Sequence, residues 1–253
     1  MMKKLLVTLL FLAYCIPAHA DTTTGLVGWW KLDEGTGTNA GDSSGQGNNG
    51  TLSGSTLPSW VPGKIGPYAL SFDGSSSYVS LGTKTIGYTN LTVAAWVKIT
   101  GSTCVDGDYN GIVSKNGYND FIICYQCGGS GEGTTGQFGG YEGPSGPSVF
   151  SNVLINDGNW HHVVLTSDGA YENSYVDGQF QNKEARSGNV PDTSAAITIG
   201  VYSYLWQYFP GFIDDVRIYN RALSEQDVLE LYNQGLGGHQ INNAVINNAV
   251  INQ

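Results

Sequence analysis

The sequence has few basic residues, few cysteines and, after its first 16 positions, no long apolar run. Only 11 of its 253 residues are Lys or Arg, against 21 Asp or Glu, so the formal net charge is −10. Nucleic acids and anionic membranes bind basic surfaces, and this composition argues against both as partners. No later stretch reaches the roughly 20 apolar residues of a membrane-spanning helix. We therefore expect no transmembrane segment.

The N-terminus has the pattern of a secretory signal peptide. Two lysines precede an apolar run over residues 5–16, and Ala18 and Ala20 form the small-x-small pattern of a cleavage site. We expect residues 1–20 to be removed, so that the mature chain starts at Asp21. Loss of the two lysines leaves 9 basic against 21 acidic residues, a net charge of −12. The predicted location is extracellular or periplasmic.

Cysteine is scarce as well. Cys15 leaves with the predicted signal, and the remaining three are an odd number for an oxidising compartment. We expect one structural disulfide, from Cys104 to either Cys124 or Cys127, and one spare thiol. The C-x-x-C at 124–127 has no second such pair and no helix-start signal beside it, so we expect no zinc site.

What the chain does contain is a series of short apolar or alternating runs. Examples are "LTVAAWVKI" at 91–99 and "WHHVVLTS" at 160–167, and clusters of Gly, Asn, Asp and Ser separate such runs. β-Branched and aromatic residues at this spacing indicate strands joined by turns. The predicted fold is all-β, an antiparallel β-sandwich or jelly roll, with residues 21–235 as one domain.

One helix is predicted near the C-terminus. Ser224 can cap it, Asp227 stands at the third helical position, Leu223 can pack on Val228, and Gly235 suits the end. After the helix, residues 236–253 repeat the letters INNAV. This tail is either a flexible extension or a β-prone adhesive segment through which copies could self-assemble.

Two adjacent acids, Asp214 and Asp215, interrupt the apolar strand that precedes this helix. Strand alternation places Asp214 on the face of Phe212, Val216 and Ile218, and Asp215 on the other face. A carboxylate on an apolar face is costly unless it is paired or bound to a metal. We therefore expect Asp214 to have a partner and Asp215 to face solvent.

The loop "AGDSSGQGNNG" at 40–50 is rich in oxygen donors and glycine. Such a loop suits a hard cation that needs six to eight oxygen ligands, and it is equally an ordinary polar surface loop. Its spacing is not that of an EF-hand.

Five pieces of the sequence resemble one family. They are "ALSFDGSSSYVSLG", "LTVAAWVKI", "GNWHHVVLTSDG", "YVDGQ" and "GFIDDVRIYNRALSEQDVLELY", in this order. The order and spacing resemble the laminin-G-like, concanavalin A-type jelly rolls of the pentraxin-like bacterial kind, over residues 25–235. The resemblance implies a structural Ca²⁺ that joins the first loop to the final strand, with the ligands Asp33, Asp42, Asn48 and Asp214.

A run of aromatic residues at 201–209 is the candidate ligand site. If it is extended, alternation places four rings on one face, those of Tyr202, Tyr204, Trp206 and Tyr208. Such a row is either sandwich core or a stacking platform for the sugar rings of an extracellular glycan, and the polar tips of the rings, which suit a half-wet surface, keep the second interpretation open.

Catalysis is not expected. Glu225, Asp227 and Glu230 match the E-x-D-x-x-E spacing of some β-glucanases with this architecture, but here they fall in the predicted helix, where they do not converge. The sequence favours a non-catalytic glycan-binding module. The alternatives are an adhesive or structural protein that binds a cell-surface protein or itself, and, third, a secreted glycosidase.

Overall fold

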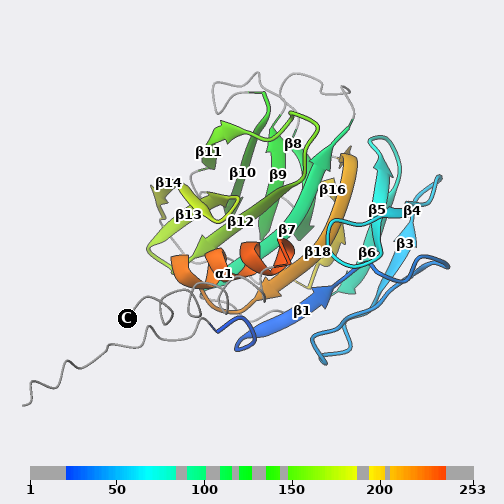
Figure 1. The fold of residues 1–253 in the computed structure, drawn as a ribbon, viewed down its shortest axis with the longest axis horizontal. Helices are drawn as coiled ribbons and strands as arrows, with labels where there is room; N and C mark the ends of the chain where they lie inside the picture. Colours follow the sequence, from blue (N-terminus) through cyan, green and yellow to red (C-terminus); the bar gives the residue numbers. More distant parts are fainter. Residues whose placement is uncertain are drawn as a thin grey trace, which may run out of the picture.

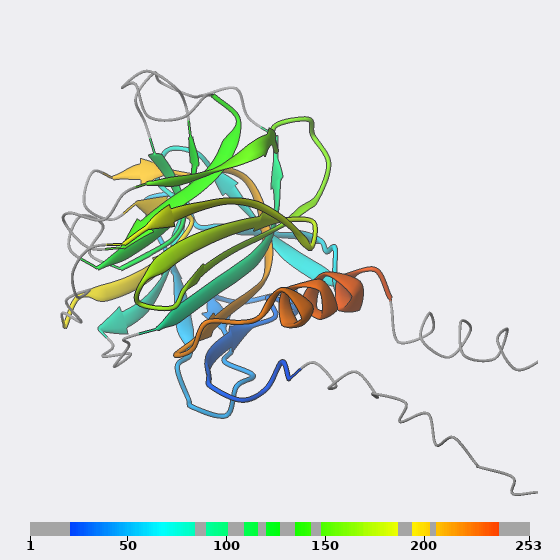
Figure 2. The same ribbon diagram turned by 90° about the vertical axis from the view of Figure 1, so that its left-hand side faces the viewer.

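The computed structural model describes residues 21–83, 90–100, 109–115, 120–126, 135–142, 148–186, 194–202 and 206–237. Two antiparallel β-sheets pack face to face, and a single described helix lies outside them (Figures 1 and 2). The predicted all-β sandwich is confirmed. Within the described residues, no helix is long and apolar enough to cross a membrane.

The first sheet has the order β14-β13-β12-β7-β18-β5-β4, and β1 also pairs with β18. Its central strand β18 is the strand of the two acids and pairs with β7 along most of its length. The strands span β1 Leu26–Trp30, β4 Ser59–Pro62, β5 Tyr68–Asp73, β7 Leu91–Ile99, β12 His161–Ser167, β13 Tyr171–Val176, β14 Gln179–Ala185 and β18 Pro210–Tyr219.

The second sheet has the order β11-β10-β9-β8-β15-β6-β3-β2, and a short hairpin, β16-β17, lies beside it. The strands span β2 Asn39–Ala40, β3 Gly50–Ser53, β6 Tyr78–Thr83, β8 Tyr109–Lys115, β9 Phe121–Gln126, β10 Gln137–Glu142, β11 Val149–Leu154, β15 Ala196–Ile199, β16 Val201–Tyr202 and β17 Gln207–Tyr208.

The core lies between the sheets and follows from alternation along the strands. In β7, Val93, Ala95 and Val97 point into the main apolar cluster. Between them, Ala94 packs in a second cluster with residues of the helix, and Trp96 stacks on Tyr232 at 5.6 Å between ring centroids. Because both faces of β7 are covered, the strand reads as nearly continuous apolar sequence.

The turn between β13 and β14 has the predicted two-residue form. Asp177 and Gly178 both have positive φ, +51° and +73°. A type I′ turn requires this conformation at both central positions, and Asp-Gly is one of the sequences that adopts it most readily. The predicted hairpin is confirmed.

The helix α1, Glu225–Gly235, lies across the outer face of the sheet that contains β7 and β18 (Figure 1). Ser224 and Asp227 form the predicted capping box, and Leu223 and Val228 share one apolar cluster. Gly235 is the last residue of the helix, as expected, and Gly237, two residues further on, takes the left-handed conformation. A Cβ on Gly235 would lie 2.4 Å from the Trp96 ring, so close packing explains this glycine.

Cys124 is a buried free thiol in β9, packed with Ile122 and Tyr202. The predicted pairing of Cys104 with Cys124 is therefore absent from the structure. Cys104 and Cys127 lie outside the described residues, as does most of the tail, so a Cys104–Cys127 disulfide and self-assembly through the tail stay predictions.

We expect Cys124 to resist thiol reagents in the folded protein, because burial raises the pKa of its thiol and blocks access. Counting of reactive thiols tests this. The expected counts are none in the native mature protein, one in denaturant without reductant, and three after reduction. Labelling of Cys124 under native conditions would contradict the prediction.

Candidate functional site

The β16-β17 hairpin sits on β8 and carries most of the predicted ligand residues. Asn110 donates to the Tyr208 carbonyl at 2.6 Å, and the Tyr109 N–H donates to the Gln207 side chain at 2.9 Å. Ser114 donates to the Val201 carbonyl at 2.9 Å. Both strands of the hairpin are thus fixed to one strand of the second sheet.

Gly111 allows this close approach. A Cβ at Gly111 would lie 2.3 Å from the Tyr202 backbone nitrogen and 2.4 Å from the Val201 carbonyl carbon. These atoms belong to the backbone and cannot move aside as a side chain could. The hairpin therefore depends on a glycine at this position of β8.

The four aromatic residues of the sequence prediction do not share one face. Tyr202 is buried with Ile122 and Cys124, whereas Trp206 is 59% exposed. Tyr208 is half-buried, and Tyr204 lies outside the described residues. The difference arises because these residues form a tight hairpin rather than one extended strand, so alternation does not run through it.

Trp206, Tyr208 and Tyr78 form the aromatic cluster of this surface. Trp206 stacks on Tyr208 at 6.4 Å between ring centroids with an interplanar angle of 30°. Tyr78, at the start of β6, meets Trp206 edge-on at 6.4 Å and 69°. Sequence reasoning missed Tyr78, since only the pairing of β6 with β15 brings it to the hairpin.

The loop that leads into Tyr78 is held by a single carboxylate. Asp73 accepts from the backbone N–H groups of Ser75, Ser76 and Ser77 at 2.8–3.0 Å. Burial alone would raise the pKa of Asp73, but these donors outweigh it and hold the pKa well below its usual range. Asp73 is therefore ionised and fixed, and the loop presents Tyr78 rigidly.

The same surroundings shift the pKa of the Tyr208 phenol. Partial burial raises its pKa, and the neighbouring Tyr78 and Asp73 act in the same direction. The hydroxyl therefore stays protonated at physiological pH and can both donate and accept hydrogen bonds.

The backbone of Trp206 is unusual. Its φ is +56°, in the left-handed region that costs a non-glycine residue about 1–2 kcal/mol. A strained backbone and a large exposed apolar ring both oppose stability. Such features concentrate at binding sites. The arrangement offers an exposed indole face flanked by two phenols.

The predicted calcium ligands do not come together. Asp42 and Asn48 lie in the first loop, where the Asp42 carboxylate accepts from the N–H groups of Trp29, Ser44 and Asn48. The Asn48 amide donates to the Val27 carbonyl at 2.8 Å. These bonds attach the loop to β1.

Asp33 and Asp214 bind a different segment, the loop between β4 and β5. Asp33 accepts from the Tyr68 N–H at 3.3 Å, and Asp214 accepts from the N–H groups of Lys64 and Ile65 at 2.8 and 2.9 Å. Among the described residues, no group of three or more His, Cys, Asp or Glu side chains could hold a metal ion. The four residues therefore do not fit a shared Ca²⁺.

A β-bulge changes the faces expected for the two acids. Asp215 has a φ of +46°, and the pairing of β18 with β7 shifts register between Asp214 and Arg217. Asp214 lies opposite Trp96 on the outer side of the sheet, while Val216 points into the core. The expectation that Asp214 shares a face with Val216 is wrong, because the extra residue reverses the alternation.

Asp215 is also not exposed as expected. It is 4% exposed, accepts from the Trp29 indole at 2.6 Å and pairs with Arg217 at 3.0 Å. Asp214 is fully buried, and burial raises its pKa to about 7, against the opposing effect of the Ile65 and Lys64 donors. Sequence reasoning was right that Asp214 needs a partner, but the partner is a set of backbone N–H groups.

A pocket lies between β1 and the first loop. Its volume is about 650 Å³. The Trp29 ring on its wall already holds the Lys31 ammonium and the Arg217 guanidinium, each 4.4 Å from the ring centroid. It is lined by Thr23, Gly25, Leu26, Val27, Trp29, Ser43, Ser44, Gln46, Asn48 and Asn220. Because two cations occupy the Trp29 ring, this pocket is a poorer stacking platform than the cluster around Trp206.

His161, at the start of β12, lies between two carboxylates. Its Nδ1 is 2.8 Å from Asp177 and its Nε2 is 3.0 Å from Asp157. The hydrogen bond to Asp177 is the largest of the effects that raise the pKa of His161, partial burial opposes it, and Asp157 adds to the rise. The protonated imidazole therefore stabilises the fold.

This ion pair predicts a pH dependence of stability. The His161 contribution is fully present below its ordinary pKa of about 6.5 and is lost as pH rises through its raised folded pKa. We expect the contribution to stay under about 1 kcal/mol, because both partners are partly exposed. The fall in melting temperature between pH 5.5 and 8.5 should be smaller in His161→Gln. An equal fall in both proteins would contradict the assignment.

Comparison with known families and structures agrees with this fold. Residues 73–229 match the family model described as the concanavalin A-like lectin/glucanases superfamily. No curated protein sequence matches the chain at a significant level.

Similar solved structures include domain 4 of AbnA, a GH43 extracellular arabinanase from Geobacillus stearothermophilus, in complex with arabinotriose. The TM-score is 0.65 at 22% identity, over 82% of this chain and 98% of that one. The binding domain of Paraclostridial Mosquitocidal Protein 1 has a TM-score of 0.66 at 16% identity, over 83% and 52%.

The receptor binding domain of botulinum neurotoxin C/D mosaic serotype has a TM-score of 0.63 at 15% identity, over 83% and 51%. The chain thus spans nearly all of the arabinanase domain but about half of each toxin chain. At these identities the similarity shows a shared fold.

Proposed function

Because this chain belongs to the concanavalin A-like lectin/glucanase superfamily, we propose that it is a secreted, non-catalytic module that binds an extracellular carbohydrate through Tyr78, Trp206 and Tyr208. The observation that carries the proposal is Trp206, a 59% exposed indole in a strained backbone conformation between two tyrosines. The arabinanase domain of the same fold, solved with arabinotriose, supports it.

The chemistry of the cluster suits a sugar. A pyranose or furanose ring has an apolar face of C–H groups that can lie on an indole, and the Tyr78 and Tyr208 hydroxyls can exchange hydrogen bonds with its hydroxyls. The hairpin bonds to β8 and the Asp73 loop hold the three rings before a ligand arrives. Preorganisation of this kind reduces the entropy cost of binding.

A non-catalytic role fits the positions of the acids. Glu225 and Asp227 lie in the first turn of α1, and Asp227 is engaged with Ser224 and Arg221. Asp73, beside the aromatic cluster, accepts hydrogen bonds from its own loop. Glycoside hydrolysis needs two carboxyl groups facing each other across the bond to be cleaved, and these acids lack that arrangement.

Titration with oligosaccharides tests the proposal. The mature protein is mixed with a panel that includes arabino-oligosaccharides, and binding is followed by calorimetry and by tryptophan fluorescence. We expect at least one glycan to bind and to change the indole emission, and Trp60→Phe, on β4 and outside the aromatic cluster, to bind equally. If no glycan of the panel bound, the proposal would be contradicted.

Calcium binding remains a proposal that rests on the family resemblance alone. Of the predicted ligands, Asp42 and Asp214 already accept hydrogen bonds from backbone N–H groups. A rise in melting temperature when Ca²⁺ is returned to chelated protein would support a site elsewhere in the chain.

A further inference from the structure

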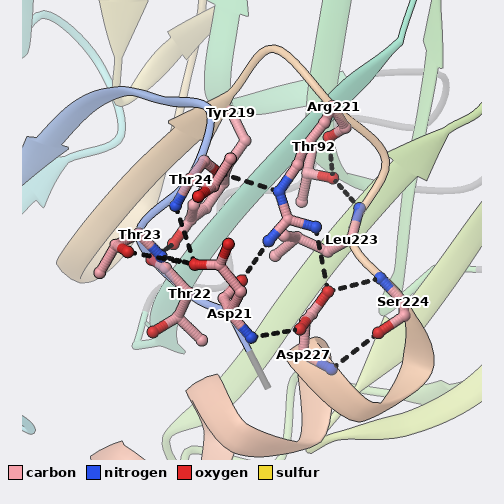
Figure 3. A network of polar contacts seen from close by, with 10 residues as sticks. All are labelled: Asp21, Thr22, Thr23, Thr24, Thr92, Tyr219, Arg221, Leu223, Ser224 and Asp227. Atoms are coloured by element: carbon pink, nitrogen blue, oxygen red, sulfur yellow. Dashed lines mark hydrogen bonds and ion pairs between the residues drawn. The ribbon is translucent and has the colours of Figure 1, made fainter. Parts of the chain in front are cut away.

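The first residues of the predicted mature chain are tied to the start of helix α1. The Asp21 backbone nitrogen donates to the Asp227 carboxylate at 2.9 Å (Figure 3). Arg221 donates to the Asp21 and Thr24 carbonyls, and the Tyr219 hydroxyl donates to the Thr22 carbonyl at 3.1 Å. Residues some 200 positions apart in sequence are thus joined at one point.

Asp227 is the centre of this contact. It is 6% exposed, and its carboxylate also accepts from the Ser224 N–H and from Arg221, both at 3.0 Å. Burial alone would raise the pKa of Asp227, but the donors from Ser224, Arg221 and Asp21 outweigh burial and hold the pKa below its usual range. The carboxylate is therefore ionised and little exposed to water.

Asp21 is positioned by its own side chain. Its carboxylate folds back to accept from the N–H groups of Thr23 and Thr24 at 3.0 and 2.9 Å. This turn points the Asp21 nitrogen at Asp227 (Figure 3). The geometry of an N-terminal ion pair is present at the residue where the sequence predicts cleavage.

We propose that removal of the signal peptide at the Ala20–Asp21 bond creates an α-ammonium group that forms an ion pair with the buried Asp227 carboxylate, and that this pair locks the mature N-terminus to helix α1. The proposal depends on the predicted cleavage site and is independent of the proposed glycan binding. Processing would then stabilise the fold as well as release the chain.

The bond chemistry is a simple hydrolysis. Water adds across the Ala20–Asp21 peptide bond under the action of a signal peptidase, so that the hydroxyl goes to the Ala20 carbonyl carbon and one proton goes to the Asp21 nitrogen. The new Ala20 carboxylic acid then releases its proton to solvent, and the Asp21 amine takes up a proton at neutral pH. One amide N–H thus becomes an ammonium group with three protons and a full charge. Hydrogen bonds between ionised partners are roughly twice as strong as those between neutral ones.

The positive and negative charges around the new amine are equal in number. Asp21 and Asp227 supply two carboxylates, while the ammonium and Arg221 supply two cations. Among the described residues, Tyr219 is a further titratable group in contact with this segment, and its pKa is raised, chiefly by burial. Between pH 7 and 10 the amine is therefore the group of this cluster that loses its charge.

The test compares two proteins that differ by one residue: the chain from Asp21 to Gln253, and the same chain with one alanine before Asp21. The extended chain keeps the Asp21 N–H but moves the charge away. At pH 6.5 we expect the Asp21-start protein to melt about 2–4 °C higher. Its advantage should shrink as pH rises through the raised pKa of the amine, whose ordinary value is about 7.7–8.0, and should vanish near pH 10.

Three further measurements keep the proposal falsifiable. The α-amine of the folded Asp21-start protein should react with an acylating reagent at least about tenfold more slowly than in denaturant, and Asp227→Asn should abolish the effect of the added alanine. Mass spectrometry of the exported protein should show Asp21 as its first residue. Equal melting temperatures at both pH values, or another first residue, would overturn the proposal.

Discussion

Replacement of Asp214 by alanine is expected to lower the free energy of unfolding by about 3–5 kcal/mol, because it removes the acceptor of three hydrogen bonds. The change leaves three backbone N–H groups without an acceptor, those of Lys64, Ile65 and Asp215, which lie 2.8–2.9 Å from the carboxylate oxygens. Each unsatisfied buried donor costs about 1–3 kcal/mol. Chemical denaturation of the mature protein measures the loss.

Two variants make this test specific. Asp214→Asn keeps one carboxamide oxygen as acceptor and should lose less than the alanine variant, while Asp33→Ala removes a single 3.3 Å bond at the surface and should lose under about 1.5 kcal/mol. Similar losses for Asp33→Ala and Asp214→Ala would contradict the role given to Asp214.

The two adjacent acids have separate tasks in the fold. Asp214 ties β18 to the loop between β4 and β5, and Asp215 ties it to Trp29 in β1. The bulge between them makes both contacts possible, because it turns the two carboxylates toward different segments. Lys64 adds to the first contact by placing its ammonium 4.8 Å from the Trp96 ring.

Features that depend on local sequence were predictable. The Asp177–Gly178 turn and the Ser224–Asp227 cap each require only a few adjacent residues, and both are present as expected. The surroundings of Asp214 were not predictable, because the bulge at Asp215 depends on how β18 pairs with β7. Strand alternation holds on each side of the bulge, but the alternation pattern does not reveal where the bulge lies.

The aromatic site likewise combines features that the sequence predicts with features that depend on the tertiary fold. Composition drew attention to residues 201–209, and Trp206 is indeed exposed there. Tyr202 was misplaced because the segment turns back on itself, and Tyr78 was missed because it comes from a strand distant in sequence. A cluster assembled from two segments that are far apart in sequence leaves no spacing pattern in the chain.

Replacement of Trp206 by glycine is expected to reduce glycan affinity at least about 30-fold, which corresponds to about 2 kcal/mol for the loss of a central aromatic anchor. The stability of the fold should hardly change. Loss of the ring contacts with Tyr78 and Tyr208 costs about 0.5–1.5 kcal/mol each. Relief of the left-handed backbone by glycine returns about 1–2 kcal/mol.

This combination separates a binding residue from a structural one. Tyr202→Ala, in the same hairpin but 2% exposed, should lose about 3–5 kcal/mol of stability, as large buried aromatic residues do. Phe180→Ala, another exposed aromatic on β14, should leave affinity unchanged and lose only its edge contact with Tyr175, about 0.5–1.5 kcal/mol. If Trp206→Gly instead destabilised the fold as much as Tyr202→Ala and kept full affinity, the indole would belong to the scaffold. A strained, exposed tryptophan that can be removed without loss of stability is retained for what it contacts outside the molecule.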